Sequence, residues 1–451
     1  MHRSCLRKNE GSQFPVPFLS RPLPTGYHKR LDICASSWGL AVSEAPDKNG
    51  SPALKPLPHH EGIRDFLKAE EPQVWNWYAS NKVRDEHAES IRFDLLKSTY
   101  RIERETQPDL YEAAEEVAEK LSLPVPITIY QAQNPEGLNA SIASLPNEAH
   151  VIFHGPLTSK LTDMEVRALI AHELSHLLLW RDWDGEYMIV DQILSALTHD
   201  SQADVPHFAS ARLFRLYTEI FCDRGSLCVV DNPLDVVSML VKIHTGLEEV
   251  SAESYIRQAD EIFSKEKPKT EQLSHPEAFI RARAISFWAD GDEEANKKIA
   301  AMIEGSPALE ELDLLGQTRV AALTRRLIDT LLSPKWMQTE LNLGHARMFF
   351  DGYVAPTEKA EDATFVDDMA TDDKPLLDYY CYVLLDFVAA DRELEELPLA
   401  AALVLAERLG FKERFSEIAR KELRLRKKQL ETTDREKNAL LAKAGERLAI
   451  P

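Results

Sequence analysis

Two histidines and a glutamate in the stretch ALIAHELSHLLLW carry the clearest chemical signal in the sequence. His172 and His176 are four residues apart, so on a helix both imidazoles lie on one face, close enough to bind a single ion. Zinc prefers imidazole nitrogen, and a catalytic zinc site keeps three protein ligands and one open position for water. Glu173 would then act as the general base for that water. The alternative is a satisfied pair of core histidines, so a third ligand must decide between the two.

The third ligand is expected from a second helix. A metzincin would need a glycine and a histidine where this chain has Leu179 and Asp182, so that class is excluded. The segment TEIFCD instead offers Glu219 and Asp223, which are again four residues apart. We expect Glu219 to bind the zinc, one ion per chain, and Asp223 to accept the free N–H of a zinc-bound histidine. The alternative is an exposed acidic helix face, and the apolar residues between the two carboxylates weigh against it.

The elements that position these residues are predicted to be mainly α-helical with a small β-sheet, an α+β fold. Thr162 and Glu165 form a capping-box signature, which opens a helix that runs to about Trp180. Strands are expected at residues 125–130 and 150–154, as a small edge sheet over the histidine helix. Helical patterns cover residues 61–104, 109–121, 210–230, 232–250, 252–268, 277–345 and 375–428.

Composition shifts divide the chain into five predicted regions. Residues 1–60, rich in proline, glycine and serine, are expected to form a disordered leader that includes His59 and His60. A metallopeptidase domain follows at 61–290, then a helical connector at 291–353, an acidic linker at 354–374, and a helical domain with a charged tail at 375–451.

Charge and cysteine usage exclude several classes of protein. The 451 residues carry a formal net charge of -21, which disfavours a nucleic-acid partner. Five cysteines without a C-x-x-C pair indicate free thiols in a reducing compartment rather than a disulfide framework. No apolar run approaches the roughly 18 to 20 residues of a membrane span, and no secretory signal is recognisable. We therefore expect a cytoplasmic protein with no membrane span.

Four sequence blocks resemble one family of peptidases. HELSH, EIFCD, the block SHPEAFIR and the strand residues Asn139, Ala140 and Ser141 follow the order found in the CAAX-prenyl-protease/HtpX type of gluzincin, in its soluble branch. The resemblance covers residues 90 to 290 approximately. It implies a gluzincin domain in which Asn139 and Ala140 lie on an edge strand that pairs with an extended polypeptide substrate.

The same resemblance implies that His275 and Arg281 lie near the metal. Either is a candidate donor to the oxyanion that forms during peptide hydrolysis, and His275 is alternatively a zinc ligand in a resting state. The chain departs from the family pattern at Ser175, where glycine is usual, and at Cys222, where alanine is usual. Both residues are small, and Cys222 is interpreted as a buried filler rather than a redox-sensitive group.

The C-terminal segment has a second resemblance, to TerB-like helical domains. It is carried by the stretch ADRELEE and by a following helix that ends in LGF. Asp391, Glu393 and Glu395 could bind a divalent cation, and the alternative is a capped turn with solvated carboxylates. By this resemblance the C-terminal helices are a candidate site for a protein partner.

These patterns together predict a zinc-dependent endopeptidase, a hydrolase of peptide bonds, with a role in protein quality control or stress response. The alternative is an inactive, metal-stabilised scaffold that acts through its TerB-like domain, and the intact Glu173 argues against it. A gluzincin exopeptidase is a third reading, which would need a pocket for a terminal charge.

Overall fold

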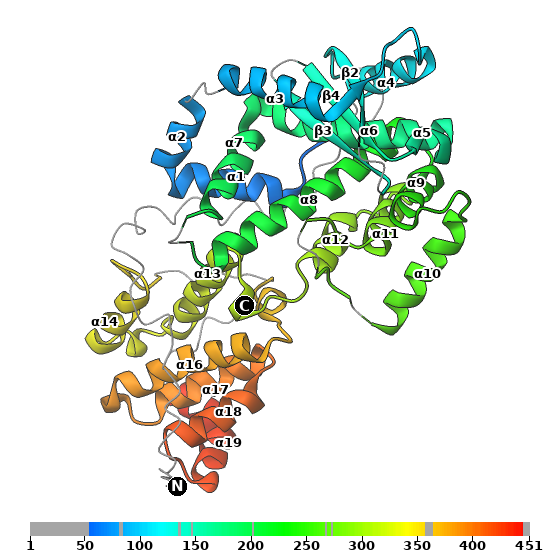
Figure 1. Ribbon diagram of the computed structural model, residues 1–451. Helices are drawn as coiled ribbons and strands as arrows, with labels where there is room; N and C mark the ends of the chain where they lie inside the picture. The colour runs from blue at the N-terminus through cyan, green and yellow to red at the C-terminus, as the bar shows by residue number, and fades with distance from the viewer. Residues whose placement is uncertain are drawn as a thin grey trace, which may run out of the picture. The chain divides into compact units, whose positions relative to one another are not determined.

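The computed structural model describes residues 54–80, 84–133, 137–145, 148–200, 203–266, 268–271, 274–356 and 364–444. Contacts divide this part of the chain into residues 54–322 with Thr371–Asp378, and residues 323–370 with 379–444 (Figure 1). The prediction of a mainly helical fold with one small sheet is confirmed. The domain boundaries inferred from composition stay predictions.

A four-stranded sheet lies in the first unit, in the strand order β1-β2-β4-β3. Strand β2 (Ile127–Ala132) pairs in parallel with β4 (Glu148–His154), and β3 (Asn139–Leu145) pairs antiparallel with β4 at the sheet edge. Strand β1 (Thr99–Arg101) lies at the other edge, where a continuous helical pattern had been predicted. That prediction is wrong at this point, because Thr99 and Tyr100 favour strands and this short segment pairs with β2. The expected strands at 125–130 and 150–154 are found as β2 and β4.

The histidine helix α6 (Asp163–Arg181) is the central helix of this unit. Thr162 caps it by accepting a hydrogen bond from the backbone N–H of Glu165, whose side chain accepts from the N–H of Thr162 in return. The predicted capping box is therefore confirmed. Most residues of α6 are buried on all sides, which explains why its sequence is apolar on several faces.

Helix α8 (Val205–Val230) packs extensively against α6, and the two helices approach closely where Gly225 meets Ser175. A Cβ atom placed on Gly225 would lie 1.9 Å from Ser175 Oγ and 2.9 Å from Ser175 Cβ. Glycine is therefore required at position 225 if α6 carries a serine at position 175. The Ser175 hydroxyl is turned back to donate to the carbonyl of Ala171, so it needs no partner on α8.

Further helices enclose this pair. They are α4 (Pro108–Lys120), α5 (Leu157–Lys160), α7 (Glu186–Leu197), α9 (Pro233–Thr245), α10 (Ala252–Lys265), α11 (Ala278–Ala289) and α12 (Ala295–Ile303). The described loop between α10 and α11 carries Ser274, His275 and Pro276, as expected. The N-terminal helices are α1 (Pro58–Glu70), α2 (Pro72–Ser80) and α3 (Arg84–Ser98).

Helix α1 corrects one expectation. His59 and His60 are 6% and 0% exposed and lie in this helix, so the predicted disordered leader cannot extend to residue 60. The aromatic rings of Tyr217 and Phe214 on α8 contact them and provide the apolar surroundings that the local sequence did not reveal. Residues 1–53 lie outside the described part of the chain.

The second unit is wholly helical in its described residues. It contains α14 (Glu340–Phe349), α15 (Phe365–Met369), α17 (Leu397–Arg408), α18 (Lys412–Glu422) and α19 (Lys427–Lys443), with the C-terminal parts of α13 (Leu314–Leu331) and α16 (Lys374–Ala390). Its core includes the fully buried Phe387, Leu403 and Phe415. Asp391 caps a short turn by accepting from the backbone N–H of Glu393, at 3.0 Å. This is the geometry of the capped turn that was the alternative to a cation site.

We predict that Gly225→Ala lowers the free energy of unfolding by about 1–3 kcal/mol, because the added methyl group overpacks the α6–α8 contact. It should also weaken metal binding, since both helices carry predicted ligands. Urea denaturation and zinc titration would measure the two effects. Gly344→Ala in α14 is the matched control, since nothing lies within 4 Å of a Cβ at that position.

The double variant Ser175→Gly, Gly225→Ala should recover much of the loss, because it moves the small residue from one helix to the other. If Gly225→Ala and Gly344→Ala cost the same stability, close packing at Gly225 is not what constrains α6 against α8.

Candidate metal centre

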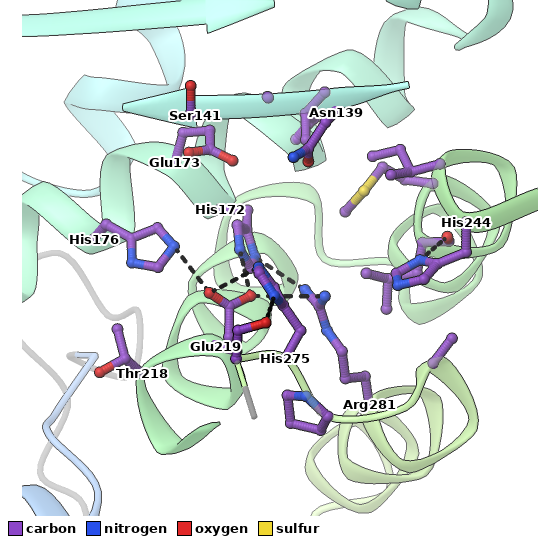
Figure 2. A pocket seen from close by; sticks show the side chains of 18 of the residues that line it. Asn139, Ser141, His172, Glu173, His176, Thr218, Glu219, His244, His275 and Arg281 are labelled. Carbon is purple, nitrogen blue, oxygen red and sulfur yellow. Dashed lines mark hydrogen bonds and ion pairs between the residues drawn. The ribbon is translucent and has the colours of Figure 1, made fainter. Parts of the chain in front are cut away.

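Helices α6 and α8 run antiparallel and bring three of the predicted ligands to one point (Figure 2). The Nε2 atom of His172 lies 3.4 Å from Glu219 Oε2, and the Nε2 atom of His176 lies 3.5 Å from Glu219 Oε1. Ligand atoms placed tetrahedrally at zinc distances of about 2.0–2.1 Å are about 3.3 Å apart. The two separations between imidazole and carboxylate are therefore close to those expected around a single zinc ion.

Asp223 orients the first histidine. Its Oδ1 atom lies 3.1 Å from His172 Nδ1, and as a carboxylate it can only accept, so the proton of the neutral ring resides on Nδ1. The lone pair of Nε2 is then free to face Glu219 and a metal. The Asp223 carboxylate is in turn held by the Nε and Nη2 atoms of Arg281, at 2.7 and 2.6 Å. This is the arrangement expected of a carboxylate that fixes the tautomer of a metal ligand.

Burial and charge make this point favourable for a cation. Burial opposes the ionisation of Glu219, but the nearby imidazoles and Arg281 outweigh it and hold the pKa of Glu219 below its usual range. Burial would lower the pKa of His172, yet the Asp223 and Glu219 carboxylates raise it to about 10, so a metal ion that binds Nε2 must displace a proton from it. Once His172 is neutral, as a metal ligand must be, three buried carboxylates, counting Glu173, face the single buried guanidinium of Arg281. A divalent cation would balance this excess of negative charge.

Unsatisfied buried atoms support the same fit. Glu219 Oε2 and His176 Nδ1 are buried, and neither has a hydrogen-bond partner among the described residues. Burying such an acceptor without a partner is costly, and a metal ion would satisfy the Glu219 oxygen. Burial lowers the pKa of His176 to about 4, so its ring is neutral and its lone pair is available to a metal. The residues present therefore fit a zinc ion.

Cys222 offers an alternative third ligand. Among the described residues, the group with one potential ligand atom each within 4.8 Å of one another is His172, His176 and Cys222. Burial, followed by the negative charges of Glu219 and Glu173, raises the pKa of the Cys222 thiol well above its ordinary value, and a thiol must ionise to bind zinc. Cys222 is also absent from the cavity lining, to which Glu219 belongs. We favour Glu219 for these reasons.

Glu173 lies on the opposite side of the histidines, facing the sheet edge (Figure 2). It borders a cavity of about 960 Å³, together with His172, His176 and Glu219. Burial raises the pKa of Glu173 to about 7, a value suited to accepting and releasing a proton near neutral pH. The predicted substrate-binding residues Asn139 and Ala140 also border this cavity, on the edge strand β3.

The two predicted oxyanion donors differ in accessibility. The side chain of His275 is 54% exposed, with its Nε2 atom 3.6 Å from Glu219 Oε1 and its Nδ1 atom 2.9 Å from Ser274 Oγ. Arg281 is 4% exposed and is occupied by Asp223, although its Nη1 atom lies 3.7 Å from Glu219 Oε2. His275 is thus the more accessible of the two. Its position is compatible with both of its predicted roles, as an oxyanion donor and as a resting-state ligand.

Several cavity residues were not predicted from the sequence. Ser274 precedes His275 and orients its ring, and His244, given no role from its spacing, lines the cavity from α9. Apolar and aromatic walls come from three further helices, a grouping that no sequence spacing reveals. The lining also includes Asp191, Arg215, Met239, Leu240, Ile243, Tyr255 and Phe279.

Comparisons with known proteins agree with this geometry. Residues 104–212 match the sequence profile of peptidase family M48. The chain is 29% identical over 199 residues to the plastoglobule-localized metallopeptidase 48, chloroplastic, of Arabidopsis thaliana, a match that covers 40% of this chain and 57% of that protein. The chain thus spans a little over half the length of this relative. Both findings support a metallopeptidase.

The profile match covers strands β2 to β4 and α6 but ends before Glu219, so the third ligand rests on the geometry of α8. Among the described helices, none combines the length and the apolar character needed to cross a bilayer. The expected cytoplasmic location stays a prediction.

Metal analysis of variants can distinguish Glu219 from Cys222 as the third ligand. We predict that Glu219→Gln loses most of its zinc after dialysis, whereas Cys222→Ala keeps about one equivalent per chain. Elemental analysis of purified protein measures both, and circular dichroism checks that the variants are folded. Zinc retained by Glu219→Gln and lost from Cys222→Ala would reverse the assignment.

We also predict that Asp223→Asn weakens zinc affinity by about 10- to 100-fold, because the carboxylate that fixes the His172 tautomer is lost. Competition with a chromophoric chelator measures the affinity. Asp260→Asn is the matched control, since Asp260 pairs with Arg283 at the surface and away from the cavity. Equal affinity in the two variants would contradict an orienting role for Asp223.

Proposed function

We propose that this chain is a zinc-dependent endopeptidase. The observation that carries the proposal is the convergence of two imidazole nitrogens and the Glu219 carboxylate beside a cavity that also contains Glu173. His172, His176 and Glu219 would hold the metal. When bound, zinc lowers the pKa of a water molecule to about 7 and polarises a carbonyl group.

Glu173 supplies the proton transfers in this proposal. Its carboxylate accepts a proton from the water that attacks the peptide carbonyl and then gives that proton to the departing amine. A pKa of about 7 for Glu173 supports both transfers, because neither protonation state is strongly disfavoured near neutral pH. General acid–base catalysis of this kind contributes about 10²- to 10⁴-fold to a rate.

His275 completes the proposed site. Its Nε2 atom approaches Glu219 while Ser274 holds its Nδ1 atom, so the ring has one nitrogen directed toward the reaction centre. A donor at this position would stabilise the charge that develops on the substrate carbonyl oxygen. Arg281 contributes indirectly, because its guanidinium holds Asp223 and thereby the ring of His172.

The proposed substrate is an extended polypeptide. Strand β3 is an edge strand, and its residues Asn139, Ala140 and Ser141 border the cavity. Unpaired backbone groups of an edge strand can bind a peptide by adding it to the sheet, which places its backbone across the site without selecting particular side chains. This supports cleavage within a polypeptide.

We place this activity in protein quality control or stress response on the resemblance of the C-terminal helices to TerB-like domains. In this proposal the C-terminal unit binds a protein partner. The resemblance of residues 90 to 290 to peptidases of the CAAX-prenyl-protease/HtpX type supports the same class of reaction.

We predict that Glu173→Gln retains zinc but loses peptide cleavage by at least about 10²-fold, because the amide cannot accept the proton. Hydrolysis of casein and of a terminally blocked peptide would measure the activity. Removal of zinc by a chelator should abolish wild-type cleavage, and added zinc should restore it.

Undiminished cleavage by Glu173→Gln would refute the role of Glu173. If zinc-loaded wild-type protein cleaves neither substrate, the hypothesis of an inactive, metal-stabilised scaffold is favoured. Cleavage restricted to unblocked peptides would instead favour an exopeptidase.

A further inference from the structure

The cavity continues beyond the metal ligands by one turn of each helix. His172 on α6 faces Asp223 on α8, and His176 faces Glu219, so four residues forward on α6 correspond to four residues back on α8. The next step of this antiparallel register brings Trp180 and Arg215 to the same level. Both residues line the cavity. The register thus extends the predicted site by about 6 Å along the helix axes.

Trp180 forms an aromatic wall at this level. Its ring lies against that of His176, with the ring centroids 5.6 Å apart and the planes inclined by 32°. The indole is partly exposed, so it presents a surface to the cavity as well as to the histidine. A flat aromatic surface beside the metal ligands can contact the stem of a bound side chain.

Arg215 is an unpartnered cation in this wall. It is exposed and, within the described residues, makes no hydrogen bond or ion pair. The other arginine of the lining, Arg281, is occupied by Asp223, and the neighbouring Arg212 on α8 donates to the carbonyl of Thr270. Arg215 is therefore the guanidinium of the described cavity that remains free to bind a ligand. Its planar fork of donors matches the two oxygens of a carboxylate.

Asp191 on α7 is a counter-charge that interacts with Arg215 through space. Its carboxylate is largely buried, and burial raises its pKa while Arg215 opposes that rise. No ion pair within 4.0 Å joins the two groups in the described structure. Asp191 therefore reduces the positive potential at Arg215 without occupying its guanidinium. Replacing Asp191 by a neutral residue should therefore strengthen anion binding at Arg215.

The far side of the cavity has a different character. Helix α11 lies at the His172 end, where its Arg281 contacts Asp223, and Leu240, Ile243 and Phe279 from α9 and α11 offer an apolar surface to the cavity. A substrate that spans the cavity would therefore meet apolar side chains on one side of the metal ligands and a guanidinium on the other. This asymmetry is a basis for selecting among peptide sequences.

We propose that Arg215, with Trp180, forms a specificity subsite for a carboxylate of the polypeptide substrate, about two residues from the scissile bond. An extended chain rises about 3.3 Å per residue, so two residues span the 6 Å step from Glu219 to Arg215. The inference rests on the proposed peptidase function. The carboxylate belongs either to an acidic side chain or to the C-terminus of the peptide.

Binding to the zinc-loaded Glu173→Gln variant tests the subsite without requiring cleavage. The probes are fluorescent decapeptide pools, acetylated and amidated, in which one position at a time is Glu, Gln or Lys. We expect one Glu pool to bind about 3- to 10-fold more tightly than its Gln counterpart. Further pools with a free C-terminus distinguish a terminal carboxylate from a side-chain carboxylate.

Adding Arg215→Gln should remove this preference, and adding Asp191→Asn should increase it. Arg257→Gln on α10 is the matched control, since Arg257 is exposed, lies outside the cavity lining and changes the net charge equally. A preference that survives Arg215→Gln, or that is absent from every pool, would overturn the subsite.

Cleavage of the same peptides by the wild-type protein separates this inference from the proposed function. Zinc-dependent cleavage without any dependence on Arg215 would refute the subsite alone. Arg215-dependent binding without wild-type cleavage would refute the peptidase proposal and retain the carboxylate site.

Discussion

The candidate site depends on how closely helices α6 and α8 approach each other. Gly225 allows this approach, because a larger residue would collide with Ser175. The proposed ligands are shared between the two helices, so neither helix could surround an ion alone. Their antiparallel register sets which residues face each other, and it pairs His172 with Asp223 and His176 with Glu219. One packing contact therefore determines the ligand geometry, the orienting carboxylate and the level at which the cavity continues.

Much of this site was predictable because its residues repeat at helical spacing. The i and i+4 spacing of His172 with His176, and of Glu219 with Asp223, predicted two faces that had to meet, and the structure brings them together. The capping box at Thr162 set the start of α6 correctly. These features are local, and local patterns can be recognised in a sequence without knowledge of the tertiary fold.

The features that were missed depend on contacts distant in sequence. Strand β1 forms because β2 offers a partner, and Thr99–Arg101 is too short for its strand-favouring Thr and Tyr residues to stand out beside a helical pattern. The walls contributed by α9, α10 and α11 become a cavity only after those helices pack. His59 and His60 looked like part of a polar leader, since nothing nearby indicates that the aromatic side chains of α8 bury them.

His60 connects the N-terminal helix α1 to helix α8, which carries Glu219. Its Nδ1 atom accepts from the backbone N–H of Leu57, so its proton lies on Nε2 and is donated to the Thr218 hydroxyl, at 3.3 Å. That hydroxyl in turn donates to the carbonyl of Phe214. Burial, followed by the charge of His59, keeps the pKa of His60 well below its ordinary value, which maintains this neutral tautomer. Because Thr218 directly precedes Glu219, α1 fixes the same turn of α8 that α6 contacts through the predicted ligands.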